Sequence, residues 1–426
     1  MTRRAVNAWC LYDWANSAFA TTVMAAFFPP FYRALALRAG LADADATAAW
    51  AYTTAAALLG AALLGPLLGA VADHTGGRKR WTAGFAALGI LATAAFALLQ
   101  PGQWRLATAL FILANVGFSG SIVFYESLLP YVAQRDEIDR VSARGYALGY
   151  VGGGLLLALN VAWLAKPGLF GFADQAGAVR AAFVSVAVWW ALFTVPFLRG
   201  VPEPPAVRLP GEPTAALRAG LARLARTARE LRRYRQLTLF LVAFWIYNDG
   251  IGTIIKMATA YGDELGIGLA DMSGALLLTQ FVGVPCSLLF GRLAGRIGAK
   301  ASILIALGVY VVIAAGGWFM RTPAHFYALA ILVGTVQGGS QALSRSLFGA
   351  MTPRHRAAEF FGFFSTSSKL AGIAGPVVFG AVAQATGGSR LAIVSLVVFF
   401  VAGGALLTQV DPAEGARVAR EAEGVA

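Results

Sequence analysis

Apolar residues run along this chain in twelve long blocks, which short polar or charged stretches separate. A helix needs about 20 predominantly apolar residues to cross the hydrocarbon core of a bilayer. Each block has roughly this length, so the pattern predicts an all-α polytopic membrane protein. The predicted transmembrane helices cover residues 6–32, 47–72, 81–100, 104–130, 142–165, 178–198, 237–261, 272–294, 300–320, 324–348, 358–384 and 389–409.

The basic residues divide the connecting loops into two classes. Of the 34 Lys and Arg residues, 25 lie on the side of the predicted membrane that holds the N-terminus, 7 lie on the other side, and 2 lie within helices. Basic residues favour the cytoplasmic face. We therefore expect a multi-pass protein of the cell inner (cytoplasmic) membrane with both termini in the cytoplasm. This distribution accounts for the net charge of +13 without nucleic acid.

One long loop and a tail lie outside the predicted helices. The second part of the loop places leucines at helical spacing among arginines, which predicts a basic amphipathic helix on the membrane surface. The tail carries charges of both signs, and we expect it to be loose. The predicted organisation is an N-terminal six-helix bundle (1–198), a cytoplasmic basic linker (199–236), a C-terminal six-helix bundle (237–410) and a cytoplasmic tail (411–426).

The two predicted bundles repeat each other. "GPLLGAVADHTGGRKR" follows the second helix as "FGRLAGRIGAKA" follows the eighth, and "LYDWANSA" in the first helix matches "WIYNDGIG" in the seventh. "FYESLLP" ends the fourth helix as "LSRSLFG" ends the tenth, which sets Glu126 opposite Arg345. Matches in the same order predict two pseudo-symmetric halves. We expect Glu126 and Arg345 to close a cytoplasmic gate across these halves.

Several of these motifs resemble a known family. The loop from Gly69 through Asp73 to Arg78 resembles the signature loop of the major facilitator superfamily. "YDWANSAFATTV", "SARGYALGYVGGG", "YNDG" and "QGGSQALSRSLFGAMTP" are similar to its vacuole-effluxer branch, which takes its name from fungal autophagy-related amino-acid effluxers. The resemblance covers nearly the whole chain and implies the major facilitator fold. His74 and Glu126 depart from the residues usual at these positions.

The loop after the second helix suggests a closing contact. The resemblance implies that Asp73 accepts hydrogen bonds from a neighbouring helix N-terminus, and we expect that of the eleventh helix. Arg78 can then pair with acids of the next cytoplasmic loop, such as Asp136 or Glu137. We therefore assign Asp73 and Arg78 to gating. The alternative is that these charges only orient the chain in the membrane.

Polar residues within the helices indicate where a ligand binds, because charges inside transmembrane segments are usually functional. Helical spacing gathers them on one face each of helices one, four, seven and ten, and the resemblance implies that these helices line one cavity. "NDG" in the seventh helix predicts a local unwinding. The residues expected to bind substrate or couple protons are Asp13, Asn16, Asn115, Asn248, Asp249, Gln337, Gln341 and Lys369.

The depths of the charged residues, and alternative roles for two of them, refine this site. Depth along the helices places Asp249 and Lys369 near the midplane and Asp13 nearer the cytoplasmic entrance. Asp249 and Lys369 either bind substrate or only pair with each other. The glycines from Gly145 to Gly154 are more typical of close helix packing than of substrate contact.

These features predict a secondary active transporter that moves a small polar solute, in the first place an amino acid, by alternating access. A buried carboxylate can take up a proton, and the sequence therefore allows transport that is coupled to protons. The alternatives are a transporter of a drug-like amphiphile, a sugar or a peptide, or a non-transporting membrane scaffold. The chain has no P-loop, nucleophile elbow or metal-ligand spacing, so we expect no cofactor, no metal and no enzyme activity. We expect a monomer in the lipid bilayer.

Overall fold

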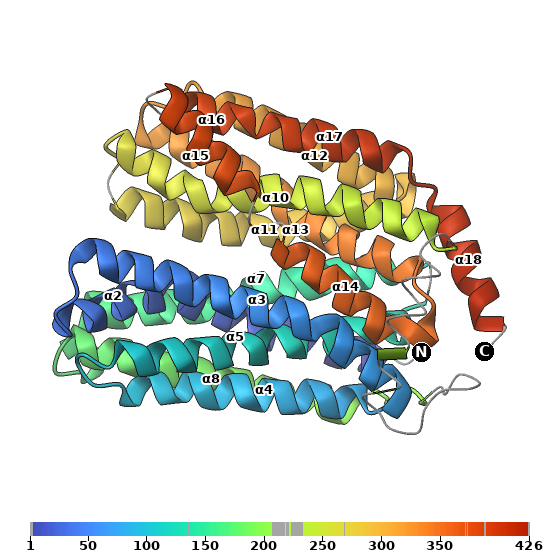
Figure 1. Ribbon diagram of the computed structural model, residues 1–426, viewed down its shortest axis with the longest axis horizontal. Helices are drawn as coiled ribbons and strands as arrows, with labels where there is room; N and C mark the ends of the chain where they lie inside the picture. Colours follow the sequence, from blue (N-terminus) through green and yellow to red (C-terminus); the bar gives the residue numbers. More distant parts are fainter. Residues whose placement is uncertain are drawn as a thin grey trace.

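Long helices run side by side along the long axis of the molecule in a computed structural model of the chain (Figure 1). The structure describes residues 3–134, 136–206, 218, 221–222, 233–267, 269–370, 372, 374–386 and 389–424. Within these residues the regular elements are all helical. The predicted amphipathic helix of the linker lies largely outside the described residues.

The first half of the chain supplies six paths along this axis. The first path is split into three consecutive helices, and the fourth ends in a short extra turn. The elements are α1 (Arg3–Ala18), the π-helix η1 (Phe19–Phe27), α2 (Phe28–Arg38), α3 (Asp43–Thr75), α4 (Arg78–Ala95), η2 (Phe96–Leu98), α5 (Trp104–Ser127), α6 (Leu129–Val132), α7 (Ile138–Ala165), η3 (Pro167–Phe170) and α8 (Gln175–Gly200).

The second half supplies six further paths and a terminal helix. Its eleventh and twelfth paths are each split in two. The elements are α10 (Arg235–Glu264), α11 (Leu269–Ile297), α12 (Ala299–Gly317), α13 (Pro323–Ala350), η4 (Arg354–Arg356), α14 (Ala357–Leu370), α15 (Ala374–Thr386), α16 (Ser389–Ser395), α17 (Val397–Thr408) and α18 (Pro412–Gly424).

The described residues confirm the predicted twelve-helix architecture. Nine of the paths are long and apolar enough to cross a membrane by length and composition alone. The other three are the first, which the π-helix divides, the tenth, α13, which carries polar residues, and the eleventh, which is split between α14 and α15. Figure 1 shows the second half, from yellow to red, lying above the first half, from blue to green.

The π-helix in the first path has a local cause in the sequence. Pro29 and Pro30 lie in the first turn of α2 and cannot donate backbone hydrogen bonds. Their rings also clash with carbonyls four residues earlier, which forces the preceding turns to widen. The backbone N–H of Phe28 accordingly bonds to the carbonyl of Val23, five residues back.

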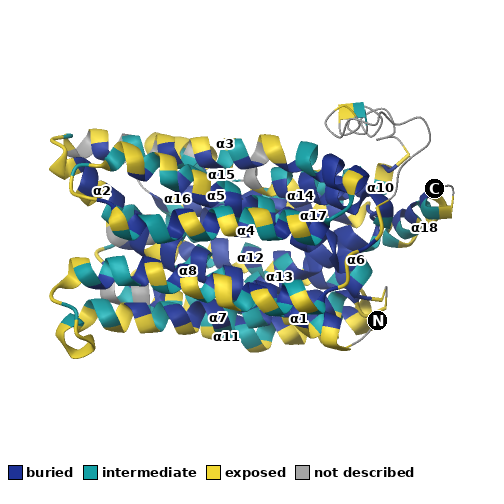
Figure 2. Ribbon diagram, turned by 90° about the horizontal axis from the view of Figure 1, so that it is seen from below, coloured by how far each residue is buried: buried dark blue, intermediate teal, exposed yellow. Residues whose placement is uncertain are grey.

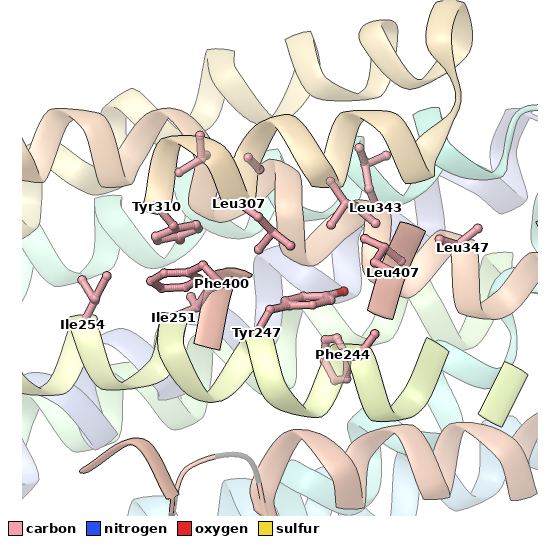
Figure 3. Packing of buried hydrophobic residues seen from close by; sticks show 14 of the residues in the cluster. Phe244, Tyr247, Ile251, Ile254, Leu307, Tyr310, Leu343, Leu347, Phe400 and Leu407 are labelled. Atoms are coloured by element: carbon pink, nitrogen blue, oxygen red, sulfur yellow. The ribbon is translucent and has the colours of Figure 1, made fainter. Parts of the chain in front are cut away.

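Each half has its own hydrophobic core. One cluster of buried residues runs from Ala8 to Val201 and the other from Tyr234 to Ala422. In the second cluster, Tyr310 and Phe400 stack with ring centroids 5.2 Å apart (Figure 3). The Tyr247 hydroxyl lies 2.6 Å from the hydroxyl of Ser344. Figure 2 shows the exposed residues on the outer surfaces of the helices, as expected for a bundle embedded in lipid.

Both chain termini lie at one end of the bundle (Figure 1). We call it the basic end, because its loops and terminal segments hold most of the Lys and Arg residues. The halves meet mainly where α3 and α5 pack on α14 and where α7 packs on α11 and α13. The halves therefore meet along defined helix faces.

The expectation of a loose tail is wrong. Asp411 caps the N-terminus of α18 by accepting from the amides of Ala413 and Glu414, at 2.9 and 3.1 Å. Ala419 is fully buried against the rest of the protein. Hydrogen bonds from Arg417 lower the pKa of Glu414 on the exposed face. Charges of opposite sign one helical turn apart stabilise the exposed face of α18. Its small apolar residues pack against the rest of the protein.

Prediction one concerns the packing of α4 on α5. A Cβ at Gly117 would lie 2.4 Å from the backbone nitrogen of Gly89, so Gly117→Ala must separate the two helices. Overpacking of this kind costs about 1–3 kcal/mol, and we expect a lower midpoint of thermal unfolding in detergent. Gly308→Ala is the control, since no atom lies within 4 Å of its Cβ position. Equal midpoints for the two variants would contradict the packing argument.

Candidate functional site

The guanidinium of Arg345 in α13 reaches out of the second half and is buried in the first. Nη2 lies 3.1 Å from Oδ2 of Asp13, and Nη1 lies 3.8 Å from Oε1 of Glu126. Nε donates to Oγ of Ser142 at 2.9 Å, and Nη2 donates to the Ser142 carbonyl at 2.9 Å. Arg345 is 1% exposed. One cation of the second half thus bonds to α1 and α7 and lies beside an acid of α5.

Aromatic rings enclose this cation. The guanidinium carbon lies 4.4 Å from the ring centroid of Tyr146 in α7, 4.8 Å from that of Trp9 in α1 and 5.9 Å from that of Tyr125 in α5. Trp9 and Tyr125 also stack on each other at 4.5 Å. Because rings exclude water and attract a cation with their faces, they strengthen the ion pair that they surround.

The predicted contact between Glu126 and Arg345 across the halves is present. Asp13, which we did not expect as a partner of Arg345, is closer and makes the hydrogen bonds. Asp13 lies toward the basic end, as the depth estimate indicated. The helix repeat relates Glu126 to Arg345, but the rotation of α1 brings Asp13 nearer.

Asp73, at the end of α3, caps the N-terminus of α14. Its carboxylate accepts from the backbone N–H of Ala358 at 3.2 Å and of Glu359 at 2.8 Å. This is the contact with the eleventh helix that the sequence predicted. Arg78 does not pair with the following loop as expected: its Nη2 lies 2.5 Å from Oδ1 of Asp73 itself. The short α3–α4 turn places these two side chains together.

The same region binds the loop before α14. Arg78 donates to the carbonyl of Arg354 at 3.2 Å, and the hydroxyl of Tyr131 donates to the same carbonyl. Close backbone packing accompanies these bonds, because a Cβ at Gly69 would lie 2.2 Å from the carbonyl oxygen of Ala358. The halves are therefore closed against each other at the basic end.

The polar face of the first helix packs against the glycines of α7. A Cβ at Gly145 would lie 2.3 Å from Oδ2 of Asp13, and one at Gly149 would lie 2.6 Å from Oγ of Ser17. Asn16 is buried and donates to the carbonyl of Tyr12 in its own helix at 2.8 Å. Much of the polar face of the first helix therefore lies in a helix–helix contact. The glycine spacing of α7 predicted such close packing.

Asp249 lies opposite the interruption of the eleventh helix. We expected the helix break in the seventh, but α10 is continuous through Asp249, and the break separates α14 from α15. Asp249 is 1% exposed. The backbone N–H groups of Ala374 and Gly375, the first two residues of α15, lie beside its carboxylate. Among the described residues, its Oδ1 accepts no hydrogen bond of normal geometry. A buried carboxylate oxygen without a hydrogen bond is unusual and calls for a physical explanation.

The remaining predicted residues are placed as follows. Asn115 is buried in α5, whereas Asn248, Gln337 and Gln341 are partly exposed. Gln341 precedes Arg345 by one helical turn and Gln337 by two, so they continue its helix face toward the middle of the bundle. Lys369 belongs to the last turn of α14, and its side chain lies outside the described residues, as does its pairing with Asp249.

Sequence reasoning missed the residues that receive the Arg345 guanidinium. Ser142 is the fifth residue of α7, and its hydroxyl also donates to the carbonyl of Ala342 at 2.7 Å. Trp9 stands four residues before Asp13, one turn away on the same face. That spacing was a usable signal for Trp9, and the motif "SARGYALGYVGGG" begins at Ser142 and includes Tyr146, although we assigned neither residue a role.

Comparison with known proteins agrees with this fold. A family model described as "Vacuole effluxer Atg22 like" matches residues 1–420. The chain is similar to the uncharacterized MFS-type transporter YxiO of Bacillus subtilis (strain 168), with 39% identity over 399 residues, 93% of this chain and 92% of the relative. Autophagy-related protein 22-1 of Penicillium rubens is 22% identical over 546 residues, 98% of this chain and 91% of the relative.

A solved structure shows the same architecture. The human organic anion transporter MFSD10 (TETRAN) superposes with a TM-score of 0.71 at 15% identity, over 95% of this chain and 99% of that chain. Family match, relative and fold thus agree. The chain belongs to the Atg22-like vacuole effluxer family of the major facilitator superfamily, whose members are membrane transporters rather than enzymes.

Proposed function

We propose that this transporter moves amino acids across the cytoplasmic membrane by alternating access, with its basic end in the cytoplasm. The observation that carries the proposal is the burial of Arg345, from the second half, among Asp13, Glu126 and Ser142 of the first. The moving bodies are the bundles 1–198 and 237–410, which the linker 199–236 joins, with the tail 411–426 on the cytoplasmic side.

The contacts at the basic end suit a reversible gate. They include the charge cluster around Arg345 and the helix cap at Asp73, with glycines between helix backbones. Polar contacts of this kind exchange for water when the halves separate, whereas a broad apolar interface would not. Opening therefore breaks few but specific bonds, as a gate between two states requires.

The centre of the bundle suits a zwitterion. Asp249 can receive an ammonium group on the buried oxygen that accepts no hydrogen bond among the described residues. Asn248, Gln337 and Gln341 are partly exposed amides that can bond to either group. The same carboxylate can couple transport to protons, because a proton can take the place of the ammonium group on Asp249.

Prediction two tests the substrate class. The purified protein in proteoliposomes should exchange amino acids in a counterflow assay, with and without a pH gradient, in preference to sugars or organic anions. Asp249→Asn should lower the rate about tenfold or more, because a hydrogen bond to a charged group contributes about 1.5–3 kcal/mol. Asp271→Asn, in the first turn of α11, is the control. Wild-type protein that moves no amino acid would reject the substrate class, and an unaffected Asp249 variant would reject the site.

Prediction three tests the gate. Arg345→Ala leaves two acids buried without this cation, which costs the closed state about 3–5 kcal/mol. Spin labels on Thr75 and Arg296, exposed at the basic end of opposite halves, should then report longer distances.

The background for these labels replaces the free cysteines, Cys10 and Cys286, with alanine. Gly145→Ala should act in the same direction, since its Cβ would displace Asp13 from the pair. Arg292→Ala removes an exposed charge at the same end and should leave the distances unchanged. Unaltered distances in both test variants would exclude Arg345 as the gate.

A further inference from the structure

A pocket with basic walls opens beside the start of α4, outside the contacts between the halves. Its volume is about 790 Å³, and its described lining includes Lys79, Arg80 and Trp81 of α4 with Leu198 and Glu203 from the other wall. Arg80 is exposed and Lys79 is partly exposed. The pocket therefore presents two cations at the basic end, where a membrane surface would lie.

An apolar groove continues from this pocket along α4. It has a volume of about 330 Å³, shares Arg80 and Trp81 with the pocket, and runs over Gly84, Phe85 and Leu88. From Arg80 to Leu88 the helix advances about 12 Å. Gly84 is exposed, and no atom lies within 4 Å of its Cβ position, so the groove is open there. The groove thus leads from the polar surface toward the apolar depth of the bilayer.

The charges around the pocket favour an anion. Arg78, the first residue of α4, is already paired with Asp73, so Lys79 and Arg80 are the cations that line the pocket. The positive end of the α4 dipole adds to them. Glu203 is an acid in the described lining, and its Oε2 accepts from the backbone N–H of Lys79 at 3.0 Å. A small anion would use only the pocket, whereas a molecule with an anionic head and an acyl chain fills both spaces.

We propose that this pocket and groove form a binding site for an anionic phospholipid, which we call the α4 lipid site. The phosphate lies between Lys79 and Arg80, and one acyl chain lies over Gly84 and Leu88 beside the ring of Trp81. Basic pockets at the membrane surface bind lipid head groups in this manner. The proposal does not depend on the transported substrate. The site also adjoins the α3–α4 turn, which carries the Asp73 cap of α14.

Prediction four tests the head-group contact by native mass spectrometry of the full-length protein in detergent. Phosphatidylglycerol should bind, and phosphatidylcholine with the same chains should bind much more weakly. Lys79→Ala with Arg80→Ala should weaken phosphatidylglycerol binding about tenfold to thirtyfold, from about 1 kcal/mol for each basic residue. The control is Arg292→Ala with Arg296→Ala, which removes two exposed charges from the matching end of α11. Equal losses in the two double variants would leave only a general surface charge and overturn the site.

Further variants separate a lipid from a free anion. Gly84→Phe fills the groove without changing charge and should reduce phosphatidylglycerol binding severalfold, whereas Gly308→Phe, in equally open space on α12, should not. Glu203→Gln keeps an acceptor for the Lys79 amide but removes the acid, so binding should tighten. Inorganic phosphate at millimolar concentration should not displace the lipid. Displacement by phosphate, or a groove variant without effect, would overturn the lipid assignment.

Discussion

The closed basic end depends on one constraint: a guanidinium buried in the opposite half must have partners there. Arg345 carries its charge across the boundary and bonds to Asp13 and Ser142, with Glu126 and three aromatic rings around it. Removing a charge from water costs several kcal/mol, and only well-placed partners return that energy. The ion pair between Arg345 and Asp13 therefore adds little to the free energy of unfolding, but it requires a specific arrangement of α1, α7 and α13.

Close backbone contacts make that arrangement possible. Gly145 leaves room for the ion pair, and Gly69 lets α3 approach α14 until the Asp73 carboxylate reaches the first amides of α14. Small residues give flat helix faces that can part and meet again without side-chain repacking. The hydrogen bonds of Arg345 and Asp73 across the halves therefore depend on the glycines, because these bonds form only when the helices lie close together.

Much of this could be predicted from sequence, and the failures have physical reasons. The twelve apolar blocks predicted the number of helices, and the resemblance to the signature loop of the major facilitator superfamily implied the capping role of Asp73. Which carboxylate pairs with Arg345 depends on the rotation of α1, which periodicity does not determine. The break expected at Asp249 lies in the neighbouring helix instead, since packing on α17 keeps α10 regular despite its poor helix formers.

Asp13 and Asp249 occupy equivalent helices of the two halves, but different groups lie beside them. The partner of Asp13 is Arg345, which belongs to the opposite half and leaves when the halves separate. Asp249 faces the start of α15, which belongs to its own half and moves with it. An ion pair across the boundary responds to the conformation, whereas a carboxylate at a helix end within one bundle keeps its surroundings. A gate needs the first property, and a ligand site that must persist in both states needs the second.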